Sequence, residues 1–230
     1  MPTGSLVNCS GILIGSLVGA MLKNHLPKRL SEALPNIFGL CAITMGISLI
    51  TNMENLSAVM LALICGAVIG ELLHMEDYLI LGLSKLEARM PGNLSKERME
   101  QLVSMVVLFC FSGTGIFGAI MSGITQDHSI LYAKTVLDFF TAVIFGSTIG
   151  YMLALVAIPQ LLVQLILYYS SELIYPFMTN SMMNDFKALG GVITLAVGLK
   201  ISGIKKSQVL NMLPGLVLVF FFSWFWTQYL

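Results

Sequence analysis

Long stretches without formal charge follow one another along this chain, and they constrain its fold more than any motif does. Residues 101–126, 139–171 and 207–230 contain no Asp, Glu, Lys or Arg. A helix needs about 20 mostly apolar residues to cross the hydrocarbon core of a bilayer. Only 10% of the chain is charged, against about 25% in soluble domains. The sequence therefore predicts an all-α, polytopic transmembrane helical bundle that forms a single membrane domain over residues 1–230.

Eight segments are apolar enough to be interpreted as membrane spans. They are residues 4–22, 35–51, 57–73, 102–124, 135–157, 159–178, 188–203 and 209–228. The fifth and sixth are joined only through Pro159 and Gln160, which fits either a tight hairpin or a broken helix. Six spans is the alternative count if residues 157–178 are re-entrant.

Residues 75–100 differ from the spans around them. Leu79, Leu83 and Leu86 share one helix face, with charged residues on the others, and the segment Pro91-Gly92-Asn93 follows as a polar turn. This pattern predicts a cytoplasmic amphipathic helix at the membrane interface, followed by a loop.

The distribution of basic residues predicts the orientation. Groups follow the first, third and seventh spans: Lys23, Lys28 and Arg29; Lys85, Arg89, Lys96 and Arg98; Lys205 and Lys206. With eight spans these groups lie on one side, which the positive-inside rule makes cytoplasmic. Both termini are then expected outside the cytoplasm.

An internal repeat is suggested by two segments that align without a gap. Residues 32–50 match residues 184–202, so that Gly39 aligns with Gly191 and Gly46 with Gly198. The repeats would be 1–74 and 157–230, with the segment 75–100 and central helices at 101–156 between them. Each repeat has three helices, so the copies would be inverted, as in many transporters. Chance similarity between short glycine-containing helices is the alternative.

Asp138 is the strongest site candidate, because an ionisable side chain in a membrane segment is costly and usually functional. Lys134 lies four residues before it, so the two can pair on one helix face. Two interpretations remain open. The pair is either a structural ion pair near the outer leaflet, or Asp138 lines a pore or binds a cation.

Neutral polar residues give four further ion-binding candidates. Ser112 and Thr114 lie in a glycine-rich stretch that weakens its helix, and freed carbonyls at membrane depth need a cavity or protein partners. Asn211 precedes Pro214, which interrupts a helix, and Asn8 lies in the first span. Each can equally serve helix packing.

No arrangement of residues indicates an enzyme, a cofactor or a metal centre. The sequence has no GxSxG, HExxH or phosphate-binding loop. Twelve basic residues balance twelve acidic ones, so charge gives no indication of nucleic-acid binding. The expected partners are the lipid bilayer, a small ion or solute, and a second copy of the chain in a homo-oligomer.

Several stretches resemble bacterial inner-membrane proteins of the YqgA/YdfK type, and the YqgA branch most closely. They are NCSGILIGSLVGAML, GAVIGELLHMED, LFCFSGTGIFGAIMSGIT, SILYAKTVLDFFTAVIF and VLNMLPGL. The resemblance covers nearly the whole chain and implies the bacterial cytoplasmic membrane, with a suggested role in ion transport. The chain has Gln164-Leu165 where other branches carry Gln-Gly.

Two functions of different classes follow from these observations. The first is a transporter or channel for a small ion, with a monovalent cation favoured, in which Asp138 supplies the negative charge. The second is a non-transporting membrane protein that binds a partner or lipid, or assembles with itself through glycine-rich faces such as Gly11, Gly15 and Gly19. A polar-lined cavity beside Asp138 would favour the first.

Overall fold

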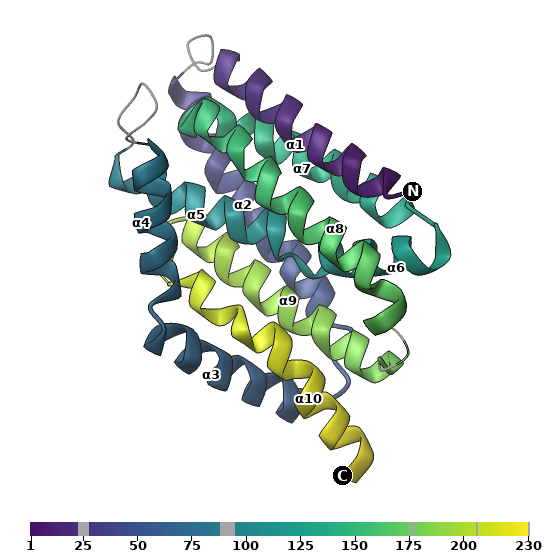
Figure 1. Cartoon of the computed structure of the whole chain (residues 1–230). Helices are drawn as coiled ribbons and strands as arrows, with labels where there is room; N and C mark the ends of the chain where they lie inside the picture. Colours follow the sequence, from purple (N-terminus) through teal and green to yellow (C-terminus); the bar gives the residue numbers. More distant parts are fainter. Residues whose placement is uncertain (23–27, 88–94, 175, 177, 206, 230) are drawn as a thin grey trace.

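The computed structural model of the protein is a bundle of α-helices (Figure 1). It describes residues 1–22, 28–87, 95–174, 176, 178–205 and 207–229, and no strand occurs among them. The helices are α1 (Thr3–Leu22), α2 (Lys28–Ile50), α3 (Leu56–Leu72), α4 (Met75–Glu87), α5 (Lys96–Cys110), α6 (Gly113–Thr125), α7 (Ser129–Ile149), η1 (Tyr151–Val156), α8 (Ala157–Ile174), α9 (Asn180–Ile201), η3 (Val209–Met212) and α10 (Pro214–Tyr229). The all-helical prediction is confirmed.

The number of membrane spans is lower than the eight expected from the sequence. Six stretches are long and apolar enough to cross a membrane: Thr3–Leu22, Lys96–Thr125, Ser129–Ile149, Tyr151–Leu173, Asn180–Ile201 and Val209–Tyr229. A seventh is added if α3 and α4 form one span bent by 51°. Within α2 the apolar stretch Asn36–Ile50 is shorter than a span. Eight spans are therefore not confirmed, although a multi-pass membrane protein is.

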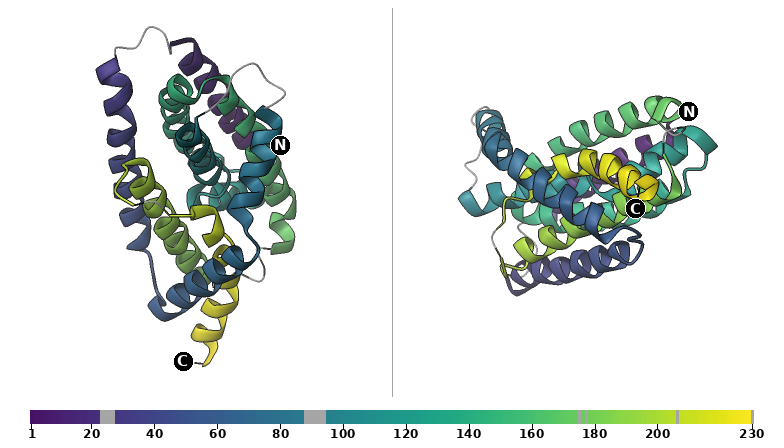
Figure 2. Two further views of the ribbon diagram at one scale, coloured as in Figure 1. Left: turned by 90° about the vertical axis from the view of Figure 1, so that its left-hand side faces the viewer. Right: turned by 90° about the horizontal axis from the view of Figure 1, so that it is seen from below.

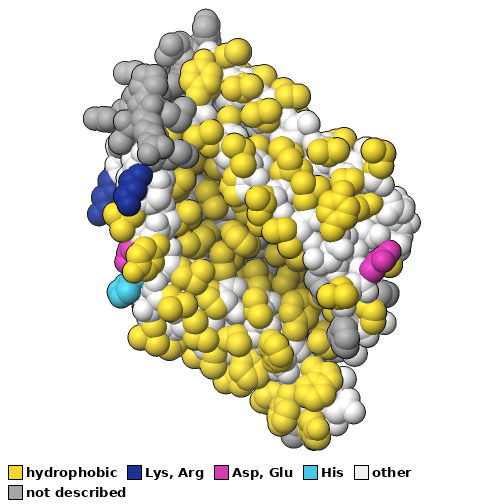
Figure 3. Space-filling view, in the orientation of Figure 1, with side chains coloured by type: hydrophobic (Ala, Val, Ile, Leu, Met, Phe, Trp, Pro, Cys, Tyr) yellow, Lys and Arg dark blue, Asp and Glu magenta, His cyan; other side chains and the backbone are white. Residues whose placement is uncertain are grey.

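The surface has the character that a lipid environment requires. Large apolar side chains project outward from most helices, including Leu72, Leu173 and Phe221. Figure 3 shows one face on which apolar side chains predominate, with charged side chains only near its edges. Water-soluble monomers rarely expose an apolar surface of this extent.

Glycines allow α1 to lie directly against α7. Gly11, Gly15 and Gly19 follow one another at four-residue spacing along the contact. A Cβ atom at Gly15 would be 2.6 Å from the backbone oxygen of Phe139. Since these glycines already contact α7 of the same chain, that face of α1 is not free to pack against a second copy of the protein.

The helices α2 and α9 cross through two glycine pairs. Gly39 lies against Gly198, and Gly46 against Gly191. In each pair a Cβ atom on the glycine of α9 would come within 2.7 Å of the backbone oxygen of the glycine on α2. Figure 2 shows the two helices side by side in both views. Small residues permit this close approach in membranes.

Interruptions divide several of the long apolar stretches. Helix α5 ends at Cys110 and α6 begins at Gly113, so the break expected in the serine- and glycine-rich stretch is present. Helix α7 ends before Gly150, whose φ of 88° suits a residue without a side chain. The joint expected at Pro159 and Gln160 is therefore wrong: the chain turns at Gly150, and both residues belong to α8.

Some sequence expectations lie outside the described residues. They are the polar turn Pro91-Gly92-Asn93 and the basic residues Lys23, Arg89 and Lys206. Helix α4 is present where an amphipathic helix was expected. Its position at the membrane interface stays a prediction.

Candidate functional site

Lys134 and Asp138 form a buried ion pair near the middle of α7. Lys134 Nζ lies 2.5 Å from Asp138 Oδ2, and the two residues are 4% and 5% exposed. The four-residue spacing places both side chains on the same face of the helix. Such burial does not fit a solvated surface pair.

Asn8 joins this pair from the neighbouring helix. Its side-chain Nδ2 donates a hydrogen bond of 2.8 Å to Asp138 Oδ2, and the residue is fully buried. The glycine contact between α1 and α7 brings the two backbones close enough for this short amide side chain to reach the carboxylate. The same oxygen of Asp138 therefore accepts from both Asn8 and Lys134.

Two glutamines of α8 complete a polar centre. Gln160 Nε2 and Gln164 Nε2 donate to Asn8 Oδ1 at 2.5 and 2.8 Å. Both glutamines are almost fully buried, and within the described residues their side-chain oxygens have no hydrogen-bond partner. We call the set Asn8, Lys134, Asp138, Gln160 and Gln164 the Asp138 centre. In this centre, two side-chain oxygens, those of Gln160 and Gln164, accept no hydrogen bond from its N–H groups.

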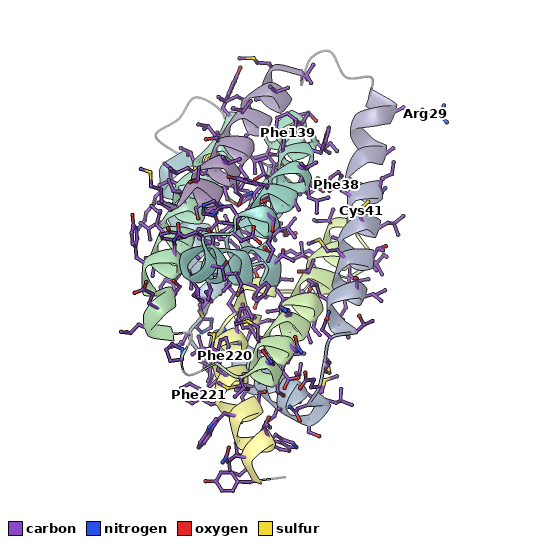
Figure 4. All side chains as sticks on the ribbon, turned by 90° about the vertical axis from the view of Figure 1, so that its right-hand side faces the viewer. Arg29, Phe38, Cys41, Phe139, Phe220 and Phe221 are labelled. Atoms are coloured by element: carbon purple, nitrogen blue, oxygen red, sulfur yellow. The ribbon has the colours of Figure 1, made fainter. Side chains whose placement is uncertain are left out.

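A cavity of about 530 Å³ reaches this centre from the side of α2. Lys134 and Asp138 line it together with hydroxyl side chains and a majority of apolar ones. The lining residues are Ile37, Phe38, Leu40, Cys41, Ala42, Thr44, Met45, Ser48, Leu108, Ser112, Lys134, Leu137, Asp138, Thr141 and Thr194. Figure 4 shows Phe38 on the side of α2 that faces α7, where its ring meets Phe145 edge to face at 6.2 Å.

The break between α5 and α6 adjoins the same cavity. Ser112 lines the cavity and caps α6, because its Oγ accepts a hydrogen bond from the backbone N–H of Gly115 at 3.2 Å. Lys134 packs over this turn: a Cβ atom at Gly115 would be 2.7 Å from Lys134 Cε. Thr114 follows in the first turn of α6, and its hydroxyl is buried without a partner among the described residues.

Asn211 does not join Asp138, although the sequence grouped the two as ion-binding candidates. It belongs to a second polar cluster at the bend between α3 and α4. Its Nδ2 donates to Glu71 Oε2 at 2.7 Å, and its Oδ1 accepts from the backbone N–H of Glu76 at 2.9 Å. Glu76 in turn forms a buried ion pair of 2.8 Å with Lys200 of α9. These contacts hold the bend against α9 and η3.

Asp185 is a third buried acid, and no pattern in the sequence singles it out. Its carboxylate accepts hydrogen bonds from the backbone N–H groups of Glu54 and Asn55, each at 2.9 Å, and from Ser223 Oγ at 2.7 Å. Asn55 Nδ2 adds a further bond of 2.9 Å. A carboxylate satisfied in this way at the start of α3 stabilises the packing of α3, α9 and α10 and leaves little capacity for a ligand.

The sequence thus identified three members of the Asp138 centre and missed two. Asn8, Lys134 and Asp138 meet as expected, Ser112 lines the adjoining cavity, and Asn211 lies elsewhere. Gln160 and Gln164 were missed as site residues. Two amides one helical turn apart within an uncharged stretch were the signal that could have found them.

Metal-ligating side chains do not gather in the described part of the chain. No group of three or more His, Cys, Asp or Glu residues there is placed to hold a metal ion. The chemistry that the Asp138 centre offers is one carboxylate, one ammonium group and neutral amide oxygens.

Comparison with known proteins gives a family but no activity. A family model described as "Protein of unknown function (DUF554)" matches residues 3–224. "Uncharacterized protein YqgA" of Escherichia coli (strain K12) is 42% identical over 233 residues, covering 100% of this chain and 99% of its own length. "Uncharacterized membrane protein YdfK" of Bacillus subtilis (strain 168) is 29% identical over 216 residues, covering 94% and 93%. No solved structure matches the chain.

Proposed function

The chain belongs to the DUF554 family, and we propose from the geometry of the Asp138 centre that it transports a small monovalent cation across the bacterial inner membrane. Asp138 supplies the negative charge in this proposal. Asn8, Gln160 and Gln164 supply neutral oxygens, and the cavity beside Lys134 and Asp138 supplies access.

The observation that carries the proposal is the surplus of oxygen around a buried carboxylate. The side-chain oxygens of Gln160 and Gln164 lack partners within the described residues, and leaving a buried polar group unpaired costs about 1–3 kcal/mol. A charged residue at the centre of a membrane helix costs a further 2.5–3.5 kcal/mol or so on insertion scales. A bound cation would offset both costs, because carboxylate and amide oxygens are the ligands that hard cations prefer.

The charge of the site favours a monovalent rather than a divalent ion. Among the described residues that line the cavity, Asp138 is the one acid, and the other oxygens of the centre are neutral. A divalent ion would leave an uncompensated buried charge, which is strongly unfavourable. A single carboxylate balances a single positive charge.

An inverted repeat is part of the proposal, because it would give the site two alternating routes of access. Each residue of the first repeat corresponds to the residue 152 positions later, so Gly39 corresponds to Gly191 and Gly46 to Gly198. If a two-fold axis relates the repeats, a contact between Gly39 and Gly198 must be matched by a contact between Gly191 and Gly46. Both contacts are present. The same relation pairs Asn8 with Gln160, which are hydrogen-bonded to each other. These contacts support a repeat with its axis at the Asp138 centre.

We also propose eight crossings, counting α2 and the bent pair α3 and α4 as one each, with both termini periplasmic. An even number of crossings is supported by Figure 1, in which the N- and C-termini lie towards the same end of the bundle and the end of α1 lies at the other. Helix α4 ends, α5 begins and α9 ends towards that other end (Figure 1). Each of these helix ends has a basic residue in or next to it, namely Lys85, Lys96 and Lys205, and the positive-inside rule assigns such an end to the cytoplasm.

The test is cation flux into proteoliposomes containing the purified protein. We expect Asp138→Asn to abolish uptake of the transported cation, because the variant lacks the charge that binds it. Asp127→Asn is the matched control, since Asp127 is an exposed acid outside α7 and its removal should leave uptake unchanged.

A folding defect in Asp138→Asn is a foreseeable complication, because Lys134 would remain buried without its partner. The double variant Asp138→Asn with Lys134→Met removes both charges and restores the charge balance. It should fold as the wild type does and still show no uptake. Normal uptake in either variant would contradict the proposal.

A further inference from the structure

Lys134 already occupies the position that a cation at Asp138 would take. Its ammonium nitrogen lies 2.5 Å from Asp138 Oδ2, which is the oxygen that also accepts from Asn8. A cation and the ammonium group would therefore compete for the same carboxylate.

Among the described residues, the surroundings of this pair carry no other charge that could compensate for an added cation. The titratable neighbours of Lys134 in the described residues are Asp138 itself, Cys110 of α5 and Cys41 of α2. Helices α1 and α8 contribute the neutral amides Asn8, Gln160 and Gln164, and α6 and α9 present hydroxyl groups at Ser112 and Thr194. Lysine and aspartate together sum to zero charge.

We propose that cation binding at Asp138 releases the proton of Lys134, so that the protein exchanges one proton for one monovalent cation. This inference rests on the proposed function and adds the coupling ion and the stoichiometry. A cation that joined a protonated Lys134 would leave one net positive charge in a buried site, which is prohibitively costly.

In the alternative, Lys134 stays protonated and moves away from Asp138 when the cation binds. The cavity does not favour this. Its lining is mostly apolar, and the described part of that lining contains no acid besides Asp138. The displaced lysine would thus remain charged without a partner, whereas a neutral amine can rest among the hydroxyl and aliphatic groups. Lysine is suited to this role because it loses its proton readily when buried, and arginine is not.

The exchange step balances in atoms and charge. The ammonium of Lys134 gives one proton to water in the cavity and becomes a neutral amine, and the incoming cation takes its place against the carboxylate of Asp138. When the cation leaves on the other side of the membrane, Lys134 takes up a proton there and the ion pair reforms. No electron transfer or additional reactant is involved.

The experiment uses proteoliposomes that carry a pH-sensitive dye in their lumen. External Li⁺, Na⁺ and K⁺ are added singly, and cation uptake and luminal pH are recorded together. We expect uptake of the transported cation to make the lumen more alkaline, with one proton leaving per cation entering. The rate should not change with an imposed membrane voltage, because the exchange moves no net charge.

Binding to the purified protein gives a second measure of the exchange. One-for-one competition requires the apparent dissociation constant for the cation to fall tenfold for each unit of pH increase while Lys134 is protonated. In Lys134→Met the competing proton is absent, so binding should become independent of pH and uptake should move charge.

Lys134→Arg is the conservative variant and preserves the ion pair. Its guanidinium cannot release a proton in a protein, so we expect the variant to fold normally and to show neither cation binding nor uptake. Wild-type uptake in Lys134→Arg would overturn the exchange.

The results separate this inference from the proposed function. Cation uptake by the wild type without any luminal pH change would refute the exchange and leave cation transport standing. An absence of uptake for every cation in the wild type would refute both.

Discussion

At the scale of single residues, the Lys134–Asp138 ion pair lies within one helix, α7, and its burial is not an efficient source of stability. Replacing a buried ion pair by apolar side chains is often neutral or stabilising, by up to about 4 kcal/mol. The unpartnered oxygens of Gln160 and Gln164 add to the cost. Apolar residues would pack α1, α7 and α8 at least as well, so the polar centre is better explained by a ligand than by stability.

Gln164→Leu tests this explanation, since it nearly conserves volume and removes one of the unpartnered oxygens together with a hydrogen bond to Asn8 Oδ1, which still accepts from Gln160. We expect the variant to unfold at the same or a slightly higher temperature and to bind the transported cation several-fold more weakly. A polar contact between membrane helices is worth roughly 1 kcal/mol, which corresponds to about a fivefold change in affinity. Cation titration and thermal unfolding measure the two quantities.

Gln101→Leu is a closely matched control. Gln101 of α5 also has a buried side-chain oxygen without a partner in the described residues, but it is not part of the Asp138 centre. It should leave cation affinity unchanged. Equal weakening in both variants would show that the effect is not specific to the site.

The sequence predicted single residues of the centre better than their grouping. Asp138, Lys134 and Asn8 stood out because they are polar residues in apolar stretches. Asn211 stood out for the same reason, yet it lies with Glu71 and Glu76 because its helix packs on α3. Which helices are neighbours depends on side-chain packing between distant segments, and hydropathy carries no information about that.

At the scale of helices, close backbone contact at glycines determines which side chains can meet. Asn8 has a short side chain and reaches Asp138 only because α1 lies directly against α7. The sequence showed the four-residue spacing of Gly11, Gly15 and Gly19, but it did not show their partner helix. The break at Gly150 was not predicted. The joint was expected at Pro159, but proline is tolerated in the first turn of a helix and does not have to end one.

Gly15→Ala should separate the two helices. The added Cβ atom would lie 2.6 Å from the backbone oxygen of Phe139, which cannot move without shifting α7. We expect a loss of about 1–3 kcal/mol in the free energy of unfolding, measured by thermal unfolding in detergent, together with weaker cation binding as Asn8 is displaced.

Gly82→Ala serves as the control for this substitution. Gly82 lies in α4, and a Cβ atom there would meet nothing within 4 Å. Alanine should be neutral or stabilise the helix by about 0.5–1 kcal/mol. A Gly15→Ala protein as stable as the wild type would contradict the role given to the contact between α1 and α7.

At the scale of the whole molecule, composition predicted the class of the protein, and packing between distant segments decided where its polar groups lie. The uncharged stretches were sufficient to predict a helical membrane protein. They were not sufficient to count its spans, because α3 is continued by α4 across a bend of 51° and part of α2 is polar. Glu76 and Lys200 were not singled out in the sequence, and the structure buries them as an ion pair at this bend.

The polar centres also differ in what they leave unsatisfied. Asp185 accepts four hydrogen bonds and Glu76 has both an ion pair and a backbone donor. The Asp138 centre is the one of the three described here that combines unpartnered oxygens with an adjoining cavity. The functional proposal for the molecule therefore depends on that centre.

Equilibrium binding of radiolabelled Na⁺ and K⁺ to the purified protein tests this claim most directly. For the wild type we predict saturable binding of one of these ions at about one site per chain, lost in the Asp138→Asn and Lys134→Met double variant. Binding of neither ion by the folded wild type, or equal binding by the folded double variant, would contradict the account.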